Sequence, residues 1–266
     1  HGQSGPRTRP LHLQLERHRR PNRRPLPLPR ALTPPRILAE GPDWLAAEKP
    51  AGLIVHPSKP EHTASLWHAL RDLLAFEIAT GGQVSLVNRL DRDTSGIVLV
   101  AKSAAAARRL CSRFGRRETR KIYLAIVSGH PPQDRFEIAA PILRQGRVAP
   151  SLIHLKQCVH PDGAHALTRF QTLHRFLAPA SEHPLPFSLV RAEPVTGRLH
   201  QIRVHLAHAG FAVLGDKIYG PCETAYLDFI AHGWTPGLQN RLLFPRHALH
   251  AASLELPSEG ISVSSP

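Results

Sequence analysis

The chain has 266 residues, of which 42% are hydrophobic, and a formal net charge of +14. This length is enough for one large domain or two small ones with a substantial core, and no apolar run is long enough to cross a bilayer as a helix. Residues 1–36 hold nine arginines and one glutamate, but the rest of the chain is also net positive, so the composition favours a polyanionic partner, nucleic acid first, over a membrane.

Residues 1–35 are rich in arginine and proline. Because proline interrupts helices and no apolar signal-peptide core is present, we expect a flexible basic arm here. An organellar transit peptide is the alternative, which the many prolines and few serines disfavour. The three cysteines are far apart and never in a C-x-x-C pair, so they predict neither a disulfide framework nor a thiolate zinc site and fit a reducing, cytoplasmic setting.

The ordered part of the chain is expected to begin at Arg36. A strand, a Gly-Pro-Asp turn, a second strand at residues 44–47 and, after a Pro-Ala-Gly break, a third segment at residues 53–56 together predict a meander. Apolar residues at helical spacing then predict a helix over residues 63–79, with Thr63 as its N-cap.

Residues 97–101 form a short apolar, β-branched run that is typical of a buried strand. Ser103 is placed to cap a following helix that would turn Ala106, Leu110 and Phe114 inward. The other faces of that helix and the loop after it carry seven basic residues, which are Arg108, Arg109, Arg113, Arg116, Arg117, Arg120 and Lys121. Such a run is either a solvated charged face or a set of phosphate contacts, and because only Glu118 interrupts it we favour phosphate contacts.

The later segments complete the fold-class prediction. "KIYLAIVSG", residues 136–157, residues 166–175 and "FSLVRAEPVTGR" predict strands. "LHQIRVHLAHAG" fits a strand or a helix, and Gly210 as the residue after a helix end favours the helix, followed by a short strand at residues 211–214. Strands dominate without regular βαβ alternation, so we predict one α+β domain over residues 36–258, with flanking helices on a mostly antiparallel or mixed central sheet, and a C-terminal tail at residues 259–266.

The stretch "VNRLDRDTSG", residues 87–96, concentrates charge just before the predicted buried strand. On an extended strand Asp91 and Asp93 would point both carboxylates to one face and suggest a two-metal phosphotransfer site. Alternatively "DTSG" forms an Asx-type turn and leaves Asp91 as the one functional carboxylate. We favour the turn, because Arg89 and Arg92 would oppose the negative charge that a hard cation needs.

Asp91 itself has two interpretations. A carboxylate between arginines should have a depressed pKa and stay ionised, as a nucleophile or base requires, but a structural salt bridge would give the same pattern. Tyr123, at the start of an apolar strand, suits base stacking and proton exchange or is an ordinary core aromatic. Arg203 lies on an apolar element and needs a buried carboxylate partner, whereas Lys49 either contacts phosphate or belongs to the Pro-Ala-Gly turn.

Other chemistries lack a matching motif. The 18 histidines include no H-E-x-x-H pair and no Cys-His cluster, so we predict no metal site. The sequence also lacks the G-x-S-x-G elbow and a glycine-rich phosphate-binding fingerprint, which leaves hydrolase and nucleotide-fold interpretations without support.

Four segments, "NRLDRDTSGIVLVAK", "RKIYLAIVSG", "TGRLHQIRVHLAHAG" and "GDKIYG", together resemble the RluA-type pseudouridine synthases in their order and spacing. The resemblance covers about residues 36–256 and implies an RNA isomerase that detaches uracil from its sugar, turns it and rejoins it through carbon, without metal or cofactor. It further implies that Asp91 is the catalytic residue, that Tyr123 is the tyrosine that stacks on the base, and that Arg203 pairs with Asp91. Arg89 corresponds to an arginine that contacts RNA around the target base.

The resemblance implies a compact catalytic domain that acts on tRNA or rRNA, and a monomer is the default expectation. Residues ahead of Arg36 are too few and too rich in proline for the S4-type RNA-binding domain that many relatives carry. Asn88, Leu199 and Glu48 depart from the family's usual residues, and because the position of Asn88 is not catalytic in the family, that departure concerns substrate details more than activity. The candidate RNA contacts are Lys49, Arg89, Arg92, Arg113, Arg116, Arg117, Arg120, Lys121 and Arg198.

Two alternatives stay open at this point. A metal-dependent nuclease would use Asp91 and Asp93 together and would require magnesium or manganese. A non-catalytic RNA-binding protein on the same fold would retain the basic surface without turnover.

Overall fold

The computed structural model describes residues 34–57, 64–178, 184–222 and 224–266. The strands are β1 (Ile37–Glu40), β2 (Trp44–Lys49), β3 (Ser85–Leu86), β4 (Ser95–Ala101), β5 (Arg120–Ser128), β6 (Arg135–Ala139), β7 (Ile142–Arg144), β8 (Gln157–Val159), β9 (Leu167–Ala178), β10 (Leu185–Pro194), β11 (Leu249–Leu256) and β12 (Ile261–Ser264). The helices are α1 (Leu66–Leu73), α2 (Ala75–Ala79), α3 (Ala104–Gly115), α4 (Gln201–His208), α5 (Ala225–His232) and α6 (Pro236–Leu242), with short 3-10 turns at Gln145–Arg147 and Pro257–Glu259. The predicted basic arm, residues 1–35, lies almost wholly outside the described residues.

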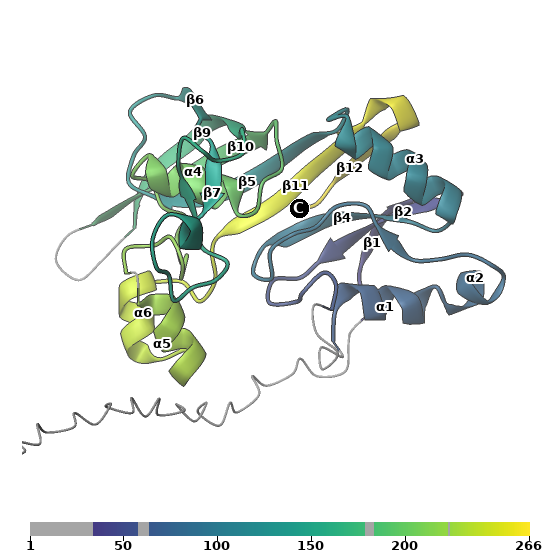
Figure 1. Ribbon diagram of the computed structural model, residues 1–266, viewed down its shortest axis with the longest axis horizontal. Helices are drawn as coiled ribbons and strands as arrows, with labels where there is room; N and C mark the ends of the chain where they lie inside the picture. The colour runs from purple at the N-terminus through teal and green to yellow at the C-terminus, as the bar shows by residue number, and fades with distance from the viewer. Residues whose placement is uncertain (1–33, 58–63, 179–183, 223) are drawn as a thin grey trace, which may run out of the picture.

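One ten-stranded sheet runs through the molecule (Figure 1). Its strand order is β1-β2-β4-β11-β5-β10-β9-β6, with β3 beside β4 and β12 beside β11, while β7 and β8 form a separate hairpin. Among the described pairings, only β4 with β11 is parallel. This mixed sheet with few helices confirms the predicted α+β class. Through this parallel pairing β1, β2, β3 and β4 join β11, and β11 connects them to the rest of the sheet.

Alternate residues of β4 face two different helices. Ile97 and Leu99 belong to the cluster that α3 covers, whereas Val98 and Val100 belong to the cluster that α1 covers. Because both faces are buried, β4 is apolar throughout rather than alternating, as the sequence predicted. Each such side chain contributes about 1.5–3 kcal/mol by leaving water, so β4 is a rigid support for the turn that precedes it.

Local sequence signals predicted α3 and α4 correctly. Ser103 caps α3, its Oγ accepting the Ala106 N–H at 3.1 Å. Gly210 follows α4 at a φ of 85°, the left-handed conformation expected just beyond a helix end. Residues 211–214 contribute only a single bridge, between Val213 and Val127, instead of a strand.

The predicted meander is wrong at its third segment. Residues 53–56 form no strand, because Leu53 packs in the cluster under α1 and the Ile54 carbonyl accepts the N–H of Leu66 at the start of that helix. The predicted cap Thr63 lies outside the described residues. The observed cap is Ser65, whose Oγ accepts the His68 N–H at 3.4 Å.

The predicted C-terminal tail is also wrong, because residues 261–264 form β12. This strand pairs with β11 and buries Ile261 and Val263 in the α3 cluster. Ser265 then donates from Oγ to Glu48 Oε1 at 2.8 Å. The period-two alternation of Ile261 and Val263 was the signal for a strand with one buried face.

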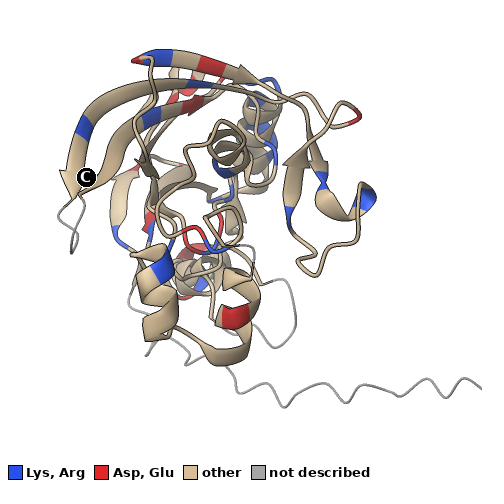
Figure 2. Cartoon of the chain, turned by 90° about the vertical axis from the view of Figure 1, so that its left-hand side faces the viewer, with Lys and Arg blue, Asp and Glu red and all other residues tan. Residues whose placement is uncertain are grey.

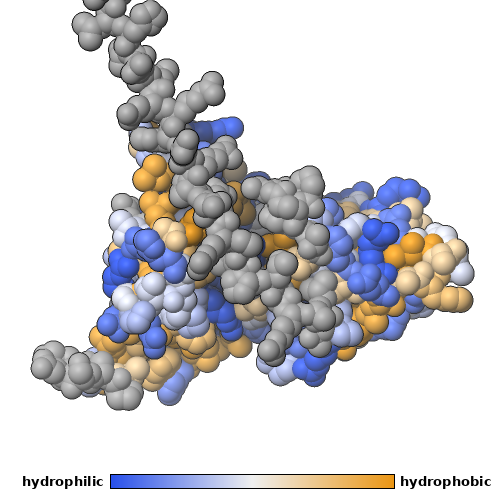
Figure 3. Space-filling model, turned by 90° about the horizontal axis from the view of Figure 1, so that it is seen from below, coloured by the Kyte–Doolittle hydropathy of each residue, from blue (hydrophilic) through white to orange (hydrophobic). Residues whose placement is uncertain are grey.

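None of the helices in the described part of the chain is long and apolar enough to cross a membrane. Hydrophilic and hydrophobic side chains are interspersed on the part of the lower face that the described residues form (Figure 3). Acidic and basic residues are likewise mixed along the strands and helices (Figure 2).

Candidate active site

The charged stretch forms a turn at the entrance to β4. The Thr94 N–H donates to the Asp91 carbonyl at 3.2 Å, which closes the turn in place of an extended strand. Gly96, at a φ of 112°, lies against the backbone of Ala251 in β11, where a Cβ would collide. The turn is therefore fixed to the parallel β4–β11 junction.

A buried arginine joins two carboxylates from distant parts of the chain. Arg203, on α4 and 4% exposed, donates from Nη1 to Asp91 Oδ2 at 2.8 Å. Its Nε and Nη2 donate to the two oxygens of Asp216 at 2.6 and 2.8 Å. Asp216 is fully buried and also accepts the N–H groups of Ile218 and Tyr219. The buried carboxylate that Arg203 required is thus Asp216, in "GDKIYG", with Asp91 as the second partner.

These contacts keep all three groups charged. Burial alone would raise the pKa of Asp91, but Arg203, with smaller effects of His200 and His247, holds it below its usual value. Burial of Asp216 is likewise outweighed by Arg203, and its pKa lies well below the ordinary range. For Arg203 burial acts to lower the pKa, and the two carboxylates more than compensate. Asp91 is consequently an ionised carboxylate with Oδ2 held by Arg203 and Oδ1 free of a hydrogen bond within the described residues.

Asp91 and Asp93 do not face a common site. Asp93 pairs with Lys217 at 3.1 Å, and the Lys217 ammonium also lies 4.6 Å from the ring centre of Phe229. Asp91 instead pairs with Arg203. Within the described ranges, no group of three or more His, Cys, Asp or Glu side chains has a geometry that could hold a metal ion.

Tyr123 lies on β5 opposite Ala251 and Ala192 of the two neighbouring strands. Its side chain is partly buried, and the pKa of its hydroxyl is raised far above the ordinary value by burial and by the nearby Asp91 charge. The hydroxyl therefore keeps its proton at neutral pH. The ring, not a phenolate, is what Tyr123 presents near Asp91.

Lys49 occupies a structural position. It is fully buried, and its Nζ donates to the carbonyls of Pro50, Leu53 and Arg92 at 2.7, 2.8 and 2.9 Å. Burial lowers its pKa to about 7, against the opposing effect of Asp93 and Asp91. An ammonium with three carbonyl acceptors and no exposed surface is not placed to contact phosphate. The predicted RNA contact is therefore replaced by a bridge between the Pro-Ala-Gly turn and the Asp91 turn.

Three residues that the sequence analysis did not single out surround Asp91. His200 directly precedes α4, with Nε2 3.9 Å from Asp91 Oδ1. The Tyr219 hydroxyl lies 2.8 Å from His200 Nδ1. His247 is buried and hydrogen-bonded to Thr94 at 2.7 Å; burial and Arg203 lower its pKa to about 3. Of these, His200 and Tyr219 belonged to quoted motifs, but only the fold brings them together.

The predicted basic contacts fall into two groups. Arg89 and Arg92 are exposed at the Asp91 turn, and Arg198 is exposed just before α4, where it donates from Nε to the His165 carbonyl at 3.0 Å. The others lie near α3, which Figure 1 shows well away from α4.

The charges near α3 are partly neutralised by Glu118, which interrupts the basic run, and by Glu193, which only the fold brings there. Arg113 pairs with Glu118, and Arg120 pairs with Glu193, both at 3.0 Å. Lys121 is partly buried, 5.9 Å from the ring centre of Phe114. Arg116 and Arg117 are exposed and have no carboxylate partner in the described part of the chain.

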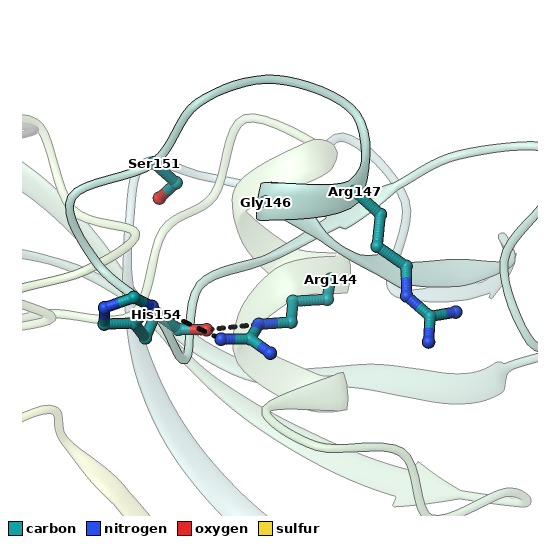
Figure 4. A pocket seen from close by; sticks show the side chains of 5 residues that line it. All are labelled: Arg144, Gly146, Arg147, Ser151 and His154. Atoms are coloured by element: carbon teal, nitrogen blue, oxygen red, sulfur yellow. Dashed lines mark hydrogen bonds between the residues drawn. The ribbon is translucent and has the colours of Figure 1, made fainter.

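A basic hollow of about 300 Å³ lies on the loop after β7. Arg144, Gly146, Arg147, Ser151 and His154 line it, and Arg144 donates from Nε to the His154 carbonyl at 2.7 Å (Figure 4). The sequence predicted strands here, and none of these five residues was among the predicted site residues. This loop leads into β8, where the Gln157 N–H donates to the Tyr219 hydroxyl beside the site.

Comparison with known proteins agrees with these features. The profile of the RNA pseudouridylate synthase family matches residues 43–208. An uncharacterised RNA pseudouridine synthase of Chloroflexus aurantiacus is 40% identical over 176 residues, 65% of this chain and 51% of that protein. The ribosomal large subunit pseudouridine synthase D of Zymomonas mobilis is 33% identical over 86% of this chain and 68% of its own length. The chain thus spans about half to two thirds of these curated relatives.

Two solved structures share the fold. Human RNA pseudouridylate synthase domain containing 1 has a TM-score of 0.64 at 28% identity, covering 86% of this chain and 82% of that one. Human RNA pseudouridylate synthase domain containing 4 has a TM-score of 0.65 at 24% identity, covering 86% and 87%, which shows a likeness of fold.

Proposed function

Because the chain belongs to the RNA pseudouridylate synthase family, and to its RluA type, we propose that it converts uridine to pseudouridine in RNA. The observation that carries the proposal is the ionised Asp91, whose Oδ2 is held by the buried Arg203 while Oδ1 stays available. A carboxylate fixed by one oxygen and free at the other is prepared to react without reorganisation.

The proposed reaction is an isomerisation. The bond between uracil N1 and ribose C1′ breaks and a bond between C5 and C1′ forms, while C5 loses a proton and N1 ends with one. Asp91 is assigned the attack, or the proton abstraction, at the sugar or base. Arg203 keeps Asp91 charged and oriented, and Asp216 holds Arg203 in place from its other side.

Tyr123 is assigned to stacking. Its ring supplies a flat apolar surface on which a uracil can rest during rotation. Because its hydroxyl keeps its proton at neutral pH, we propose stacking on the base rather than proton exchange as its role.

The substrate is proposed to be a uridine that leaves its stack, at a cost of a few kcal/mol that is least in loops. Arg89, Arg92 and Arg198 are assigned to the RNA beside it, and Arg116 and Arg117 to phosphates farther away. The relatives named as ribosomal large subunit synthases favour rRNA over tRNA as the substrate. We further propose a monomer in the cytoplasm, where the free Cys111, Cys158 and Cys222 would stay reduced.

The rival functions are less well supported. A nuclease would need Asp91 and Asp93 to act together, whereas each pairs with a different cation. A non-catalytic RNA-binding protein would not require an ionised carboxylate beside a stacking ring.

The test is to incubate wild type and Asp91→Asn, in EDTA, with rRNA and tRNA from a host that lacks the gene, and then to map pseudouridine. Conversion of a defined uridine by wild type alone is expected. No conversion with RNA binding intact would favour the binding protein, and cleavage that appears only with added magnesium would favour the nuclease.

A further inference from the structure

His200 reaches Asp91 from an uncommon backbone conformation. It has a φ of 56°, in the left-handed region that residues with a Cβ seldom adopt. Its side chain is 6% exposed, and its Nε2 lies 3.9 Å from Asp91 Oδ1, the oxygen that Arg203 leaves free. The strained position thus delivers an imidazole to the one available oxygen of the site.

The partner of the other ring nitrogen indicates which one carries the proton. The Tyr219 hydroxyl accepts the Gln157 N–H at 2.9 Å and lies 2.8 Å from His200 Nδ1. If Nδ1 were protonated, the hydroxyl hydrogen would have no acceptor in the described ranges. When the hydroxyl donates to Nδ1, it fills both of its own hydrogen-bonding roles and the ring proton lies on Nε2, on the side of Asp91 Oδ1. Burial and Arg203 also lower the pKa of His200 to about 4, which leaves one ring proton at neutral pH.

We propose that His200 and Tyr219 are positioning residues for the reacting carboxylate, with Tyr219 setting the His200 tautomer so that Nε2–H faces Asp91 Oδ1. The inference rests on the proposed function. The 3.9 Å between Nε2 and Oδ1 is too long for a hydrogen bond. The N–H therefore acts on Oδ1 through its dipole. Arg203 thus holds Oδ2 by a hydrogen bond, while His200 orients Oδ1 without bonding it and leaves it available to react.

The pair also connects the site to the loop that carries the basic hollow. Gln157 opens β8 directly after that loop, and its N–H is held by Tyr219. The Tyr219 ring separately packs beside Arg203, whose guanidinium carbon is 5.1 Å from the ring centre. Tyr219→Phe retains that packing and removes the hydroxyl, and with it both the bond to His200 Nδ1 and the acceptor of the Gln157 N–H.

The first test needs no variant of Tyr219. Long-range ¹H–¹⁵N spectra of the wild-type protein, with the His200 signals assigned from His200→Asn, should show the Nε2–H tautomer. An Nδ1–H tautomer would overturn the proposal. This result stands whether or not the protein forms pseudouridine, so failure of the proposed function and failure of this inference are distinguishable.

The second test is kinetic. Tyr219→Phe should lower kcat roughly tenfold with KM unchanged, and should turn the single His200 tautomer into a mixture. Tyr226→Phe, at a half-buried position of α5, serves as the control and should leave both unchanged. Unaltered kcat and spectra in Tyr219→Phe would overturn the proposal.

A second pair of variants covers the case in which Tyr219→Phe does not fold. His200→Gln, whose amide N–H can face the same oxygen, should retain several-fold more turnover than His200→Ala. Equal losses in the two variants would assign His200 a purely structural role and overturn the proposal.

Discussion

Replacing Asp216 by Asn preserves the shape of the side chain and removes one of the two charges that hold Arg203. Asp216 is fully buried and receives two guanidinium bonds, at 2.6 and 2.8 Å. An amide can accept only one of them, and its NH₂ then opposes a guanidinium donor. Removing one partner of a buried ion pair costs about 3–5 kcal/mol. This is a large share of the free energy of unfolding of a typical protein, which is roughly 5–15 kcal/mol.

The effect should depend on pH in a defined direction. The pKa of Asp216 is lower in the folded protein than its ordinary value of 3.8. The stability that its charge contributes is therefore fully present above about pH 4 and declines as the pH falls from there toward the folded-state pKa. The difference between wild type and Asp216→Asn should accordingly be largest near neutral pH and shrink below pH 4.

The assay is urea unfolding followed by tryptophan fluorescence at a series of pH values. Asp228→Asn makes the same substitution in an exposed Asp–Arg pair, which is joined at 2.7 Å to Arg241, and should change stability little. If Asp216→Asn unfolds at the same urea concentration as wild type, or loses no more than Asp228→Asn, the buried charge is not what holds Arg203 in place and the reasoning fails.

Three further predictions follow from the same geometry. Arg203→Lys keeps the charge but loses the paired donors, so turnover should fall about 100-fold or more in single-turnover assays; near-normal turnover would show that orientation of Asp91 does not depend on the guanidinium. Gly96→Ala places a Cβ against the Ala251 backbone at a positive φ, so the melting temperature should fall by several degrees, and an unchanged value would contradict the β4–β11 packing. Arg116→Gln should reduce the slope of log affinity for RNA against log salt concentration by about one. Arg109 is already paired with Asp43, so Arg109→Gln should leave this slope unchanged. Equal slopes in wild type and both variants would remove Arg116 from the interface.

Elements governed by local signals were predictable from the sequence. The Ser103 cap and the apolar run of β4 each lie within a few residues of the structure they specify. Residues 53–56 and β12 were mispredicted because their state depends on distant partners. In the first segment the carbonyls of Ile54 and Val55 accept the N–H groups of Leu66 and Trp67 at the start of α1, and the second segment completes an edge of β11.

The candidate site was predictable in its chemistry more than in its partners. The cost of burying Arg203 correctly required a carboxylate, but spacing alone did not identify Asp216, thirteen residues further along the chain. Lys49 was misread because burial, not residue type, decides whether an ammonium contacts phosphate or backbone carbonyls. His200 and Tyr219 lie nineteen residues apart, and only the fold brings His200 Nδ1 to the hydroxyl.

The most direct test of the central claim follows the hydrogen that the proposed reaction must release. RNA labelled with tritium at uridine C5 should lose its label to water as C5 becomes bonded to C1′. We predict tritium release by the wild-type protein in EDTA, and no release by Asp91→Asn at equal RNA binding. Equal release by both proteins would show that Asp91 does not carry the reaction, and no release by a wild type that binds the RNA fully would contradict the isomerase function itself.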